Sequence, residues 1–425
     1  MKTILMAGGK GTRISELFPD IPKPLIPIDN IPVLEREIIS LVSQGFSDII
    51  ITVSYMSDKI IEYFGNGARW GATIEYFVEK RPLGNAGALF KMSLTDDFLL
   101  LNADALFDVD FNRMVAYHQK HGGLVTLFTH PNSHPYDSGL IVADQDGRVQ
   151  KWITKEEYRP QWYRNRVNAG IHIISPKALE SSGIDPEKVG DVKVDLDRQI
   201  LKPLCNVGQV FCYDSPEYVK DMGTPDRFYQ VEGDYEKGIV QAKNLKNAQK
   251  AIFLDRDGTI NKYVGFLKNE EQLELLEGVS EAIKKINESG YLAIVVTNQP
   301  VIARGEVTRE ELDIIHNKME TLLGLDGAYL DDIYYCPHHP NKGYTGEIVE
   351  LKKKCNCRKP KPGMLIQAAK DYNIDLSKSW MIGDSESDVL AGKNAGCKTA
   401  LIGDDFYGQN KDGKSLLDIV QKILF

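Results

Sequence analysis

Short apolar runs alternate with longer amphipathic stretches over residues 3–125 of the chain. Between the first two runs, residues 32–44 place their apolar side chains on one helical face, and Gly45 is suited to end that helix. Strands and helices that alternate in this way predict a parallel sheet built from βαβ units. The runs expected to form strands buried on both faces are 3–6, 49–53, 74–77 and 98–101.

The pattern becomes more strand-like over residues 126–215, where Asp144-Gln145-Asp146-Gly147 is typical of a hairpin turn. Residues 238–250 are polar and rich in Lys, Asn and Gln, which predicts a helical tail followed by a linker. The βαβ pattern then restarts, with strands expected at 251–254, 291–296 and 380–382. We therefore expect two α/β domains, 1–237 and 250–425, joined by a linker at 238–249.

Length and composition agree with two globular domains. A chain of 425 residues is too long for one ordinary core. Its formal net charge of −9 gives no reason to expect a nucleic-acid or membrane partner, and no apolar run approaches the ~20 residues that span a bilayer. The N-terminus enters a strand after a single lysine, unlike a signal peptide. The six cysteines include a tight Cys-x-Cys pair, which favours metal binding in a reduced, cytoplasmic compartment. The sequence leaves the oligomeric state open.

A glycine-rich loop with nearby positive charge follows the first apolar run. Residues 6–13 read MAGGKGTR, and Pro22-Lys23-Pro24 comes shortly afterwards. Glycines let backbone N–H groups approach phosphate oxygens, and basic side chains neutralise a triphosphate and a departing pyrophosphate. A glycine cluster alone is most often a turn, but these features in this order within one βα unit favour a triphosphate site. Its candidate residues are Gly8, Gly9, Gly11, Thr12, Arg13 and Lys23.

This order of motifs resembles that of the sugar-1-phosphate nucleotidylyltransferases, whose signature is G-x-G-T-R followed by P-K-P. The resemblance extends over about residues 1–230. Ala103 stands where the family usually has a glycine before a metal-binding aspartate. Further matching segments are 82–88 (PLGNAGA), 101–104 (LNAD), 168–171 (NAGI) and 221–225 (DMGTP).

The resemblance implies a Rossmann-like, glycosyltransferase-A-like domain. In such enzymes a sugar 1-phosphate attacks the α-phosphorus of a nucleoside triphosphate and pyrophosphate leaves, so positioning and charge neutralisation do the catalysis. Asp104 and Asp221 would hold Mg²⁺, while Gly87 would border the nucleotide and Asn168 the sugar. Lys155 takes the place of a lysine that grips the sugar phosphate, although its Lys-Glu-Glu context also fits a solvated surface lysine.

Two acidic residues follow the run 251–254 in the second expected domain. Asp255 and Asp257 stand in the turn Asp-Arg-Asp-Gly-Thr, at the strand end where open α/β sheets bind ligands. Two acids in a turn are commonly just a turn, but further motifs accompany them. These are Thr297-Asn298 at the end of a second strand, Lys359 in Cys-Arg-Lys-Pro, and Asp384 with Asp388 after a third strand.

Together these motifs resemble the four motifs of haloacid-dehalogenase-type phosphatases and imply a haloacid-dehalogenase-like Rossmannoid domain. By this resemblance Asp255 attacks the phosphoryl group and becomes an aspartyl phosphate. Asp257 protonates the leaving oxygen and then activates water. Thr297 and Lys359 would stabilise the transferring oxygens. Asp255, Asp384 and the Asp257 carbonyl would hold Mg²⁺.

Cysteines and a histidine in this domain form a candidate zinc site. Cys336-Pro337-His338 and Cys355-Asn356-Cys357 supply three thiolates and one imidazole, a closed tetrahedral set with a structural role. Reduced cysteines in a loop are the alternative. His339 competes with His338 as a ligand, and the resemblance favours His338.

Several segments of this domain resemble the D-glycero-D-manno-heptose-1,7-bisphosphate 7-phosphatases over about residues 250–405. Histidinol-phosphate phosphatases share the zinc loop and are an alternative. The resemblance implies that Asn298, Arg304 and Arg358 contact the substrate, the two arginines at its second phosphate or its hydroxyls. Pro300-Val301 and Ser385 depart from the pattern, where the heptose enzymes often have Ser-Gly and Lys.

A fusion of these two activities narrows the substrate. A phosphatase that leaves a sugar 1-phosphate supplies the substrate class of the first domain, which is also similar to guanylyltransferases that make GDP-heptose. We predict a bifunctional enzyme of GDP-heptose biosynthesis. It removes the 7-phosphate of D-glycero-α-D-manno-heptose 1,7-bisphosphate and transfers GMP from GTP to the heptose 1-phosphate. The alternatives are a mannose-1-phosphate guanylyltransferase, an adenylyltransferase acting on the β anomer, a histidinol-phosphate phosphatase, or one domain that only binds or regulates.

Overall fold

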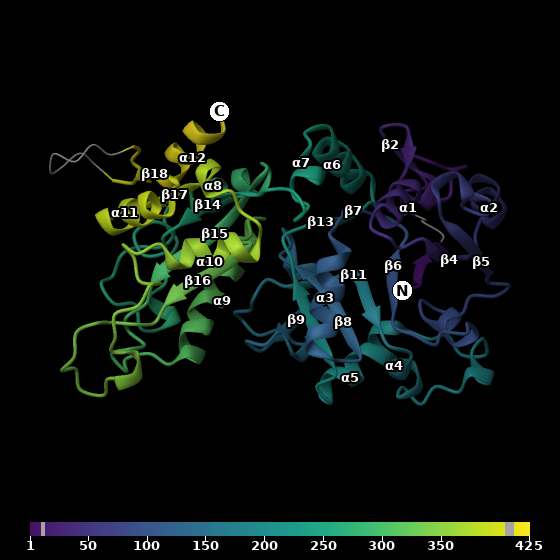
Figure 1. Ribbon diagram of the computed structural model, residues 1–425, viewed down its shortest axis with the longest axis horizontal. Coiled ribbons are helices and arrows are strands. Elements are labelled where there is room, and N and C mark those ends of the chain that lie inside the picture. Colours follow the sequence, from purple (N-terminus) through teal and green to yellow (C-terminus); the bar gives the residue numbers. More distant parts are fainter. Residues whose placement is uncertain (10–12, 404–411) are drawn as a thin grey trace. The chain divides into compact units, whose positions relative to one another are not determined.

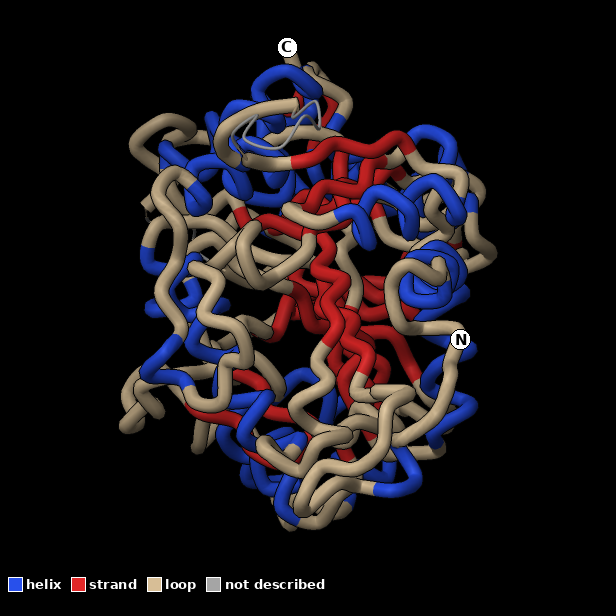
Figure 2. The backbone as a smooth tube through the Cα atoms, turned by 90° about the vertical axis from the view of Figure 1, so that its left-hand side faces the viewer, coloured by secondary structure: helices blue, strands red, loops and turns tan. Residues whose placement is uncertain are grey.

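The computed structural model describes residues 1–9, 13–403 and 412–425, which form two compact units (Figure 1). The first unit contains Met1–His130, Ile141–Ile153 and Val167–Asn244, and the second contains Pro131–Leu140, Thr154–Arg166 and Leu245–Phe425. Two short segments inside the predicted first domain are therefore grouped with the second unit. Both units alternate strands with helices, as the apolar pattern predicts (Figure 2).

The first unit is built on a mixed sheet of nine strands. They are β1 (Thr3–Met6), β4 (Asp48–Val53), β5 (Thr73–Val78), β6 (Phe98–Asn102), β8 (Val125–His130), β9 (Leu140–Ala143), β10 (Val149–Ile153), β11 (Val167–Ile174) and β12 (Val210–Asp214). The strands β6, β1, β4 and β5 are parallel, which confirms the βαβ prediction. β11 runs antiparallel to β6 and continues the sheet toward β9 and β10, while β8 pairs with both β11 and β12.

Helices cover both faces of this sheet because neighbouring residues of each central strand point in opposite directions. Leu5 packs in the cluster with α1 (Val33–Ser43), α2 (Ser57–Phe64) and α3 (Phe111–His121). Ile4 packs in the opposite cluster with α4 (Pro176–Glu180) and α5 (Lys202–Asn206). The helix predicted at 32–44 is α1, and Gly45 follows it with φ of +91°.

Two local predictions have opposite outcomes. The hairpin turn is confirmed: it joins β9 to β10, and Asp144 N donates to Arg148 O at 3.0 Å. The expectation that residues 74–77 are buried on both faces is wrong. β5 forms the edge of the sheet, and Ile74 is the one buried residue of its six. An edge strand has a neighbour on one side only, so its side chains keep contact with solvent.

A small ribbon positions the predicted metal-binding aspartates. β7 (Ala105–Asp108) and β13 (Tyr218–Asp221) pair antiparallel, with Asp221 opposite Ala105. Because Ala105 follows Asp104, this register brings the two aspartates to one end of the ribbon. The remaining elements of this unit are β2 (Pro27–Ile28), β3 (Ile31–Pro32), α6 (Pro225–Glu236) and α7 (Ile239–Ala242).

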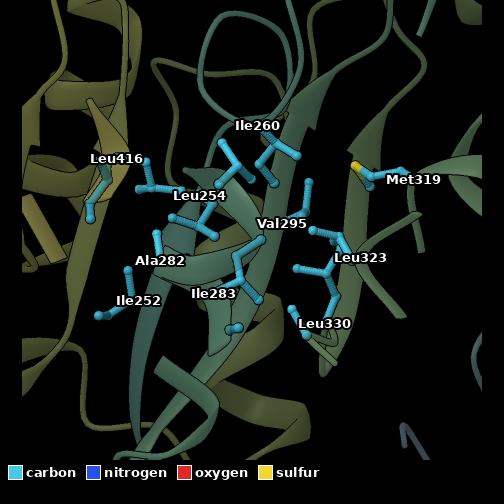
Figure 3. Close-up of a cluster of buried hydrophobic side chains, with 14 of the residues drawn as sticks. Ile252, Leu254, Ile260, Ala282, Ile283, Val295, Met319, Leu323, Leu330 and Leu416 are labelled. Atoms are coloured by element: carbon cyan, nitrogen blue, oxygen red, sulfur yellow. The ribbon is translucent and has the colours of Figure 1, made fainter. Parts of the chain in front are cut away.

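The second unit contains a parallel sheet of five strands in the order β16-β15-β14-β17-β18. These are β14 (Lys250–Leu254), β15 (Tyr291–Asn298), β16 (Asp332–Cys336), β17 (Trp380–Gly383) and β18 (Lys398–Leu401). One face packs on α8 (Val279–Asn287), α9 (Arg309–Leu325) and α12 (Leu416–Leu424), and Figure 3 shows part of this cluster. The other face packs on α10 (Gly363–Asp371) and α11 (Glu386–Ala395). The predicted α/β class of both domains is confirmed.

Candidate active sites

The glycine loop of the first unit lies at the carboxyl end of the parallel strands. Ala7 N donates to Thr52 O at 2.9 Å, and Ala103 N donates to Met6 O at 3.2 Å. The ends of β1, β4 and β6 therefore lie side by side, which is where open α/β sheets bind ligands.

The predicted glycines differ in their surroundings. A Cβ on Gly8 would lie 3.8 Å from Glu79 Oε1, whereas a Cβ on Gly9 would meet no described residue within 4 Å. Gly9 thus leaves open space at the end of β1, as a phosphate site requires. Gly11 and Thr12 lie outside the described residues.

Four of the predicted charged residues converge near Gly223. Lys23 Nζ lies 2.6 Å from Asp104 Oδ2. A Cβ on Gly223 would lie 2.8 Å from Asp221 Oδ1, 3.5 Å from Lys23 Nζ and 3.7 Å from the Arg13 guanidinium. Two cations and two carboxylates therefore share one small region, which is suited to a metal–phosphate complex.

Asp221 has a partner that the sequence analysis missed. Arg227 Nη1 lies 2.6 Å from Asp221 Oδ2. Arg227 stands in the first turn of α6, whose Thr224 cap accepts a hydrogen bond from Arg227 N. The side chains of Asp104 and Asp221 are 41% and 44% exposed, so their oxygens are accessible to an ion. Carboxylate oxygens are the donors that Mg²⁺ prefers, so these residues fit a magnesium site.

Asn168 is oriented by its neighbours on β11. Its Oδ1 accepts hydrogen bonds from Gly170 N at 3.3 Å and from His172 Nε2 at 3.1 Å. Burial lowers the pKa of His172 to about 3, so the imidazole is neutral. A Cβ on Gly170 would lie 2.3 Å from Asn102 Nδ2, at the strand end that leads to Asp104. No hydrogen bond of the Asn168 amide nitrogen is found within the described part of the chain, so this group is available to a ligand.

The other two predicted residues of this site have different environments. Gly87 is buried, and a Cβ there would lie 2.7 Å from Leu83 Cβ and 3.1 Å from Val189 Cγ1. Close packing therefore accounts for a glycine at this position without a ligand. Lys155 lies in the segment Thr154–Arg166, which is grouped with the second unit, and its contact with a sugar phosphate stays a prediction.

A buried carboxyl beside this site makes stability depend on pH. Among the described residues, neither carboxyl oxygen of Glu37 has a hydrogen-bond partner. Burial, reinforced by Asp104 and opposed by Lys23, raises its pKa well above 4.5. Between these pKa values the unfolded chain has lost the Glu37 proton and the folded protein keeps it. The free energy of unfolding should therefore fall as pH rises in this window, with a slope of up to about 1.4 kcal/mol per pH unit. Glu37→Gln should flatten this slope in urea unfolding without magnesium.

Glu35 provides the matched control on the same helix. It is buried as well, but it accepts hydrogen bonds from the Tyr63 hydroxyl at 2.6 Å and Trp70 Nε1 at 2.9 Å. Glu35→Gln replaces one acceptor oxygen by a donor, so we expect lower stability through a lost hydrogen bond. A slope that Glu37→Gln leaves unchanged would contradict the assignment.

Except for Arg304, the predicted residues of the second site line one cavity of about 390 Å³ at the carboxyl ends of β14, β15 and β17. It is bordered by Asp255, Asp257, Thr297, Asn298, Arg358, Lys359 and Asp384. Asn298 and Lys359 hold each other in place: Asn298 Nδ2 donates to Lys359 O at 3.1 Å, and Lys359 N donates to Asn298 Oδ1 at 3.0 Å. Motifs separated by about 60 residues thus form one rigid wall.

The buried ammonium of Lys359 links two carboxylates. Its Nζ lies 2.7 Å from Asp255 Oδ1 and 2.6 Å from Asp388 Oδ1. Burial lowers the pKa of Lys359, but the two carboxylates outweigh this effect and the pKa is raised overall. Burial raises the pKa of Asp255 to about 6, and the ion pair with Lys359 acts in the opposite direction. The site thus holds a cation 2.7 Å from the predicted nucleophile.

Asp257 is held by three side chains, two of which the sequence analysis did not consider. Arg256 Nη2 donates to Asp257 Oδ1 at 2.9 Å and to Oδ2 at 2.8 Å. Asn261 Nδ2 donates to Oδ1 and Gln299 Nε2 to Oδ2, each at 3.0 Å. Arg256 is fully buried and also contacts His316 Nε2 at 3.3 Å. The local sequence pattern does not predict the contacts with Gln299 and His316, because Gln299 follows β15 and His316 lies on α9.

Asp384 forms a carboxylate cluster with Asp255 and Asp388, in which one oxygen of each residue lies within 4.8 Å of the other two. Burial raises the pKa of Asp384, and Asp388 adds to this effect. Gly258 has φ of +85°, and a Cβ there would lie 2.0 Å from Asp384 Oδ2. The glycine therefore lets Asp384 reach the turn after the nucleophile. These oxygens fit Mg²⁺, which would be held by Asp255, Asp384 and the Asp257 carbonyl.

Cys336, His338, Cys355 and Cys357 form the Cys/His cluster expected from the sequence. His338 Nδ1 lies 3.3 Å from Cys357 Sγ, and the Cys336 and Cys355 sulfurs lie 3.6 Å apart. Tetrahedral zinc ligands at 2.0–2.3 Å lie about 3.3–3.8 Å from one another, so the donor set fits zinc. A hydrogen bond with Cys336 lowers the pKa of Cys357 to about 5. His339 instead contacts Asn341 at 3.2 Å, outside the cluster.

Removing one thiolate should release the metal. We expect Cys355→Ser to lose zinc and to lower the stability of the loop that carries Arg358 and Lys359, because binding and folding of such a site are coupled. Zinc analysis and thermal unfolding measure the two effects. Cys397→Ser, a buried cysteine in the same unit outside the cluster, is the control and should keep its zinc. A wild-type protein without zinc would refute the assignment.

The two predicted substrate arginines are placed differently. Arg358 lines the cavity and donates from Nη1 to His338 O at 3.3 Å, which joins it to the zinc cluster. Arg304 contacts Glu306 at 2.7 Å and two aromatic rings, and it is not among the residues that line the cavity.

The two sites define a chain with two kinds of phosphate chemistry, a nucleotidyltransferase and a phosphatase. Residues 2–238, more than half of the chain, match the nucleotidyl transferase family, and residues 356–417 match the HAD-hydrolase-like family. The D-glycero-β-D-manno-heptose-1,7-bisphosphate 7-phosphatase of Haemophilus ducreyi is 42% identical over 173 residues, which are 40% of this chain and 92% of that protein. The chain belongs to the nucleotidyl transferase family and to the family of that phosphatase, and it is a bifunctional enzyme.

Solved structures resemble each part separately. HddC from Yersinia pseudotuberculosis is 24% identical and has a TM-score of 0.46, covering 55% of this chain and 99% of that chain. A D,D-heptose 1,7-bisphosphate phosphatase from B. bronchiseptica, solved with magnesium and phosphate, is 32% identical with a TM-score of 0.37, covering 41% and 98%. No helix among the described residues is long and apolar enough to cross a membrane.

Proposed function

We propose that the chain catalyses two consecutive steps toward GDP-heptose. The second unit removes the 7-phosphate of D-glycero-α-D-manno-heptose 1,7-bisphosphate, and the first unit transfers GMP from GTP to the heptose 1-phosphate, releasing pyrophosphate. The observation that carries the proposal is that one chain holds a sugar-phosphatase-type site and a nucleotidyltransferase-type site. The product of the first reaction belongs to the substrate class of the second. These substrates are typical of a cytoplasmic enzyme.

In the proposed phosphatase reaction, a carboxylate oxygen of Asp255 attacks the phosphorus and the bond to the sugar oxygen breaks. Asp257 gives its proton to that oxygen, and later accepts a proton from the water that hydrolyses the aspartyl phosphate. Lys359, 2.7 Å from Asp255, and the Thr297 hydroxyl would stabilise the transferring oxygens. Asn298 and Arg358 border the same cavity and would contact the sugar and its second phosphate.

In the proposed transferase reaction, an oxygen of the heptose 1-phosphate attacks the α-phosphorus of GTP and pyrophosphate leaves in line. Arg13 and Lys23 would neutralise the triphosphate, and the loop at Gly8 and Gly9 would approach it through backbone N–H groups. Asn168 would contact the sugar. Magnesium at Asp104 and Asp221, and at Asp255 and Asp384 in the other unit, would supply charge neutralisation; zinc would have a structural role.

The proposed substrate is the α anomer, whereas the Haemophilus ducreyi phosphatase is named for the β anomer. The α anomer and GTP are proposed from the resemblance of the first unit to GDP-heptose-forming guanylyltransferases. The β anomer with ATP is the second candidate, favoured by that relative.

A coupled assay tests the proposal. The purified chain is given the α or β anomer of heptose 1,7-bisphosphate with GTP or ATP, and phosphate and pyrophosphate are followed together. We expect both products with the α anomer and GTP alone. Pyrophosphate only with the β anomer and ATP would replace the proposal by its second candidate. Phosphate without pyrophosphate under every nucleotide would refute the transferase assignment.

A further inference from the structure

Arg304 lies in an alternating cluster of cations and aromatic rings. Its guanidinium lies 4.1 Å from the ring centre of Phe266 and 4.5 Å from that of Tyr344. Lys352 Nζ lies 4.2 Å from the Tyr344 ring as well. We call Phe266, Arg304, Tyr344 and Lys352 the cation–aromatic cluster. Contacts of this kind contribute most when the cation is removed from water, and the side chains of Arg304 and Lys352 are 17% and 0% exposed.

The cations of the cluster lie beside acidic side chains, although the buried Arg304 Nε has no hydrogen-bond partner among the described residues. Arg304 Nη2 lies 2.7 Å from Glu306, which is also 3.2 Å from Lys268 Nζ. Lys352 Nζ lies 3.4 Å from Glu347. The guanidinium of Arg304 is therefore paired already and flanked by rings, unlike Arg358, which lines the cavity.

The rings of Phe266 and Tyr344 belong to two different loops, one at the catalytic cavity and one at the zinc site. Phe266 lines the catalytic cavity together with its neighbours Gly265 and Leu267. Tyr344 lies in the chain between the zinc-site residues His338 and Cys355. Arg304 thus connects a wall of the substrate cavity to the zinc loop, the segment between His338 and Cys355.

The backbone near Arg304 is fastened to the zinc loop as well. Ile348 N donates to Ala303 O at 3.1 Å. Gly305 approaches Gly346 so closely that a Cβ on Gly305 would lie 1.9 Å from Gly346 O. These contacts fix the position of Arg304 relative to Tyr344 before any substrate enters.

We propose that Arg304 is a positioning residue: through Phe266 and Tyr344 it fixes the cavity wall at residues 262–268 to the zinc loop, and it sets substrate affinity without touching the substrate. This replaces the direct contact that the resemblance implied for Arg304. The kinetic part of the test rests on the proposed function, because it uses the heptose bisphosphate.

The test compares Arg304→Met and Tyr344→Leu with the wild-type protein, without substrate and with it. Hydrogen exchange of the backbone at 262–268 should be roughly 3- to 10-fold faster in both variants, with unchanged zinc content. KM for heptose 1,7-bisphosphate should rise by a similar factor in both, while kcat stays within about twofold. Exchange rate and KM of the double variant should equal those of either single variant, because both substitutions remove the same Arg304–Tyr344 contact.

Matched variants distinguish the loss of the ring contacts of Arg304 from the loss of a charge and from general destabilisation. Tyr344→Phe keeps the ring and should behave as wild type. Lys398→Met removes a cation–π contact with Trp380 (5.4 Å) elsewhere in the unit and should leave exchange at 262–268 unchanged. If Tyr344→Leu does not fold, Phe266→Leu, whose ring is at a position 44% exposed, should show the same faster exchange.

A raised KM in Arg304→Met, with wild-type exchange and KM in Tyr344→Leu, would overturn the proposal in favour of direct substrate contact. Exchange is measured without substrate, so it tests whether Arg304 fixes residues 262–268 even if the heptose bisphosphate is not turned over. That last result would refute the proposed function alone.

Discussion

Asp255→Asn is expected to abolish phosphate release and to leave nucleotidyl transfer from supplied heptose 1-phosphate unchanged. A carboxamide is a poor nucleophile, and it no longer balances the Lys359 ammonium at 2.7 Å. Loss of the attacking group should lower kcat for phosphate release by more than about 10³-fold. The other activity should persist because Asp104 and Asp221 belong to the first unit, whereas Asp255 belongs to the second. Phosphate and pyrophosphate are measured separately on the same preparation.

Asp326→Asn is the matched control for this experiment. Asp326 is an exposed carboxylate at the end of α9 in the same unit, and its replacement should leave both activities within about twofold. Loss of phosphate and pyrophosphate release together in Asp255→Asn, with an unchanged melting temperature, would contradict two independent sites.

The convergence of carboxylates in the second site could be predicted from sequence because these residues follow strands. In a parallel sheet the carboxyl ends of neighbouring strands meet at one edge, so Asp255 after β14 and Asp384 after β17 must lie close together. The zinc residues were predictable for a different reason: thiolate and imidazole groups at short spacing have few other roles. In both cases a short segment of sequence is enough to show the side-chain types and their spacing.

The contacts that position these groups could not be predicted in this way. Arg256 and Gln299 hold Asp257 through side-chain rotamers, and Arg256 is itself in contact with His316 on α9. Phe266, Arg304 and Tyr344 meet although about 40 residues separate each from the next. Contacts between side chains on separate loops depend on the loop conformations, which the apolar pattern of the sequence does not predict.

Burial and grouping were the least predictable features of the fold. The run at 74–77 was expected to be buried on both faces, but it contains Glu75, and β5 lies at the sheet edge. Residues Pro131–Leu140 and Thr154–Arg166 follow strands of the first unit and are grouped with the second. Gly87 belongs to a motif implied to border a nucleotide, yet its glycine is accounted for by contact with Leu83.

Lys23→Met is expected to abolish pyrophosphate release and to leave the phosphatase unchanged. Lys23 Nζ lies 2.6 Å from Asp104 and 3.5 Å from the Cβ position of Gly223, near Asp221 and Arg13. Its side chain is only 10% exposed, so solvent screens its charge weakly. Removing one such charge from a site where charge develops should lower kcat for nucleotidyl transfer by about 10²–10³-fold. Initial rates of pyrophosphate release over a range of GTP concentrations measure the effect.

Lys2→Met distinguishes a catalytic loss from a general loss of positive charge in the same unit. Lys2 forms a more exposed ion pair with Asp48 at 3.3 Å, and such pairs contribute little to stability, so this variant should keep wild-type transfer. Lys23→Arg retains the charge but not the compact ammonium next to Asp104, and we expect an intermediate rate. If Lys23→Met transfers nucleotide as fast as Lys2→Met, then the cluster around Gly223 is not the transferase centre, and the triphosphate must bind elsewhere on the first unit.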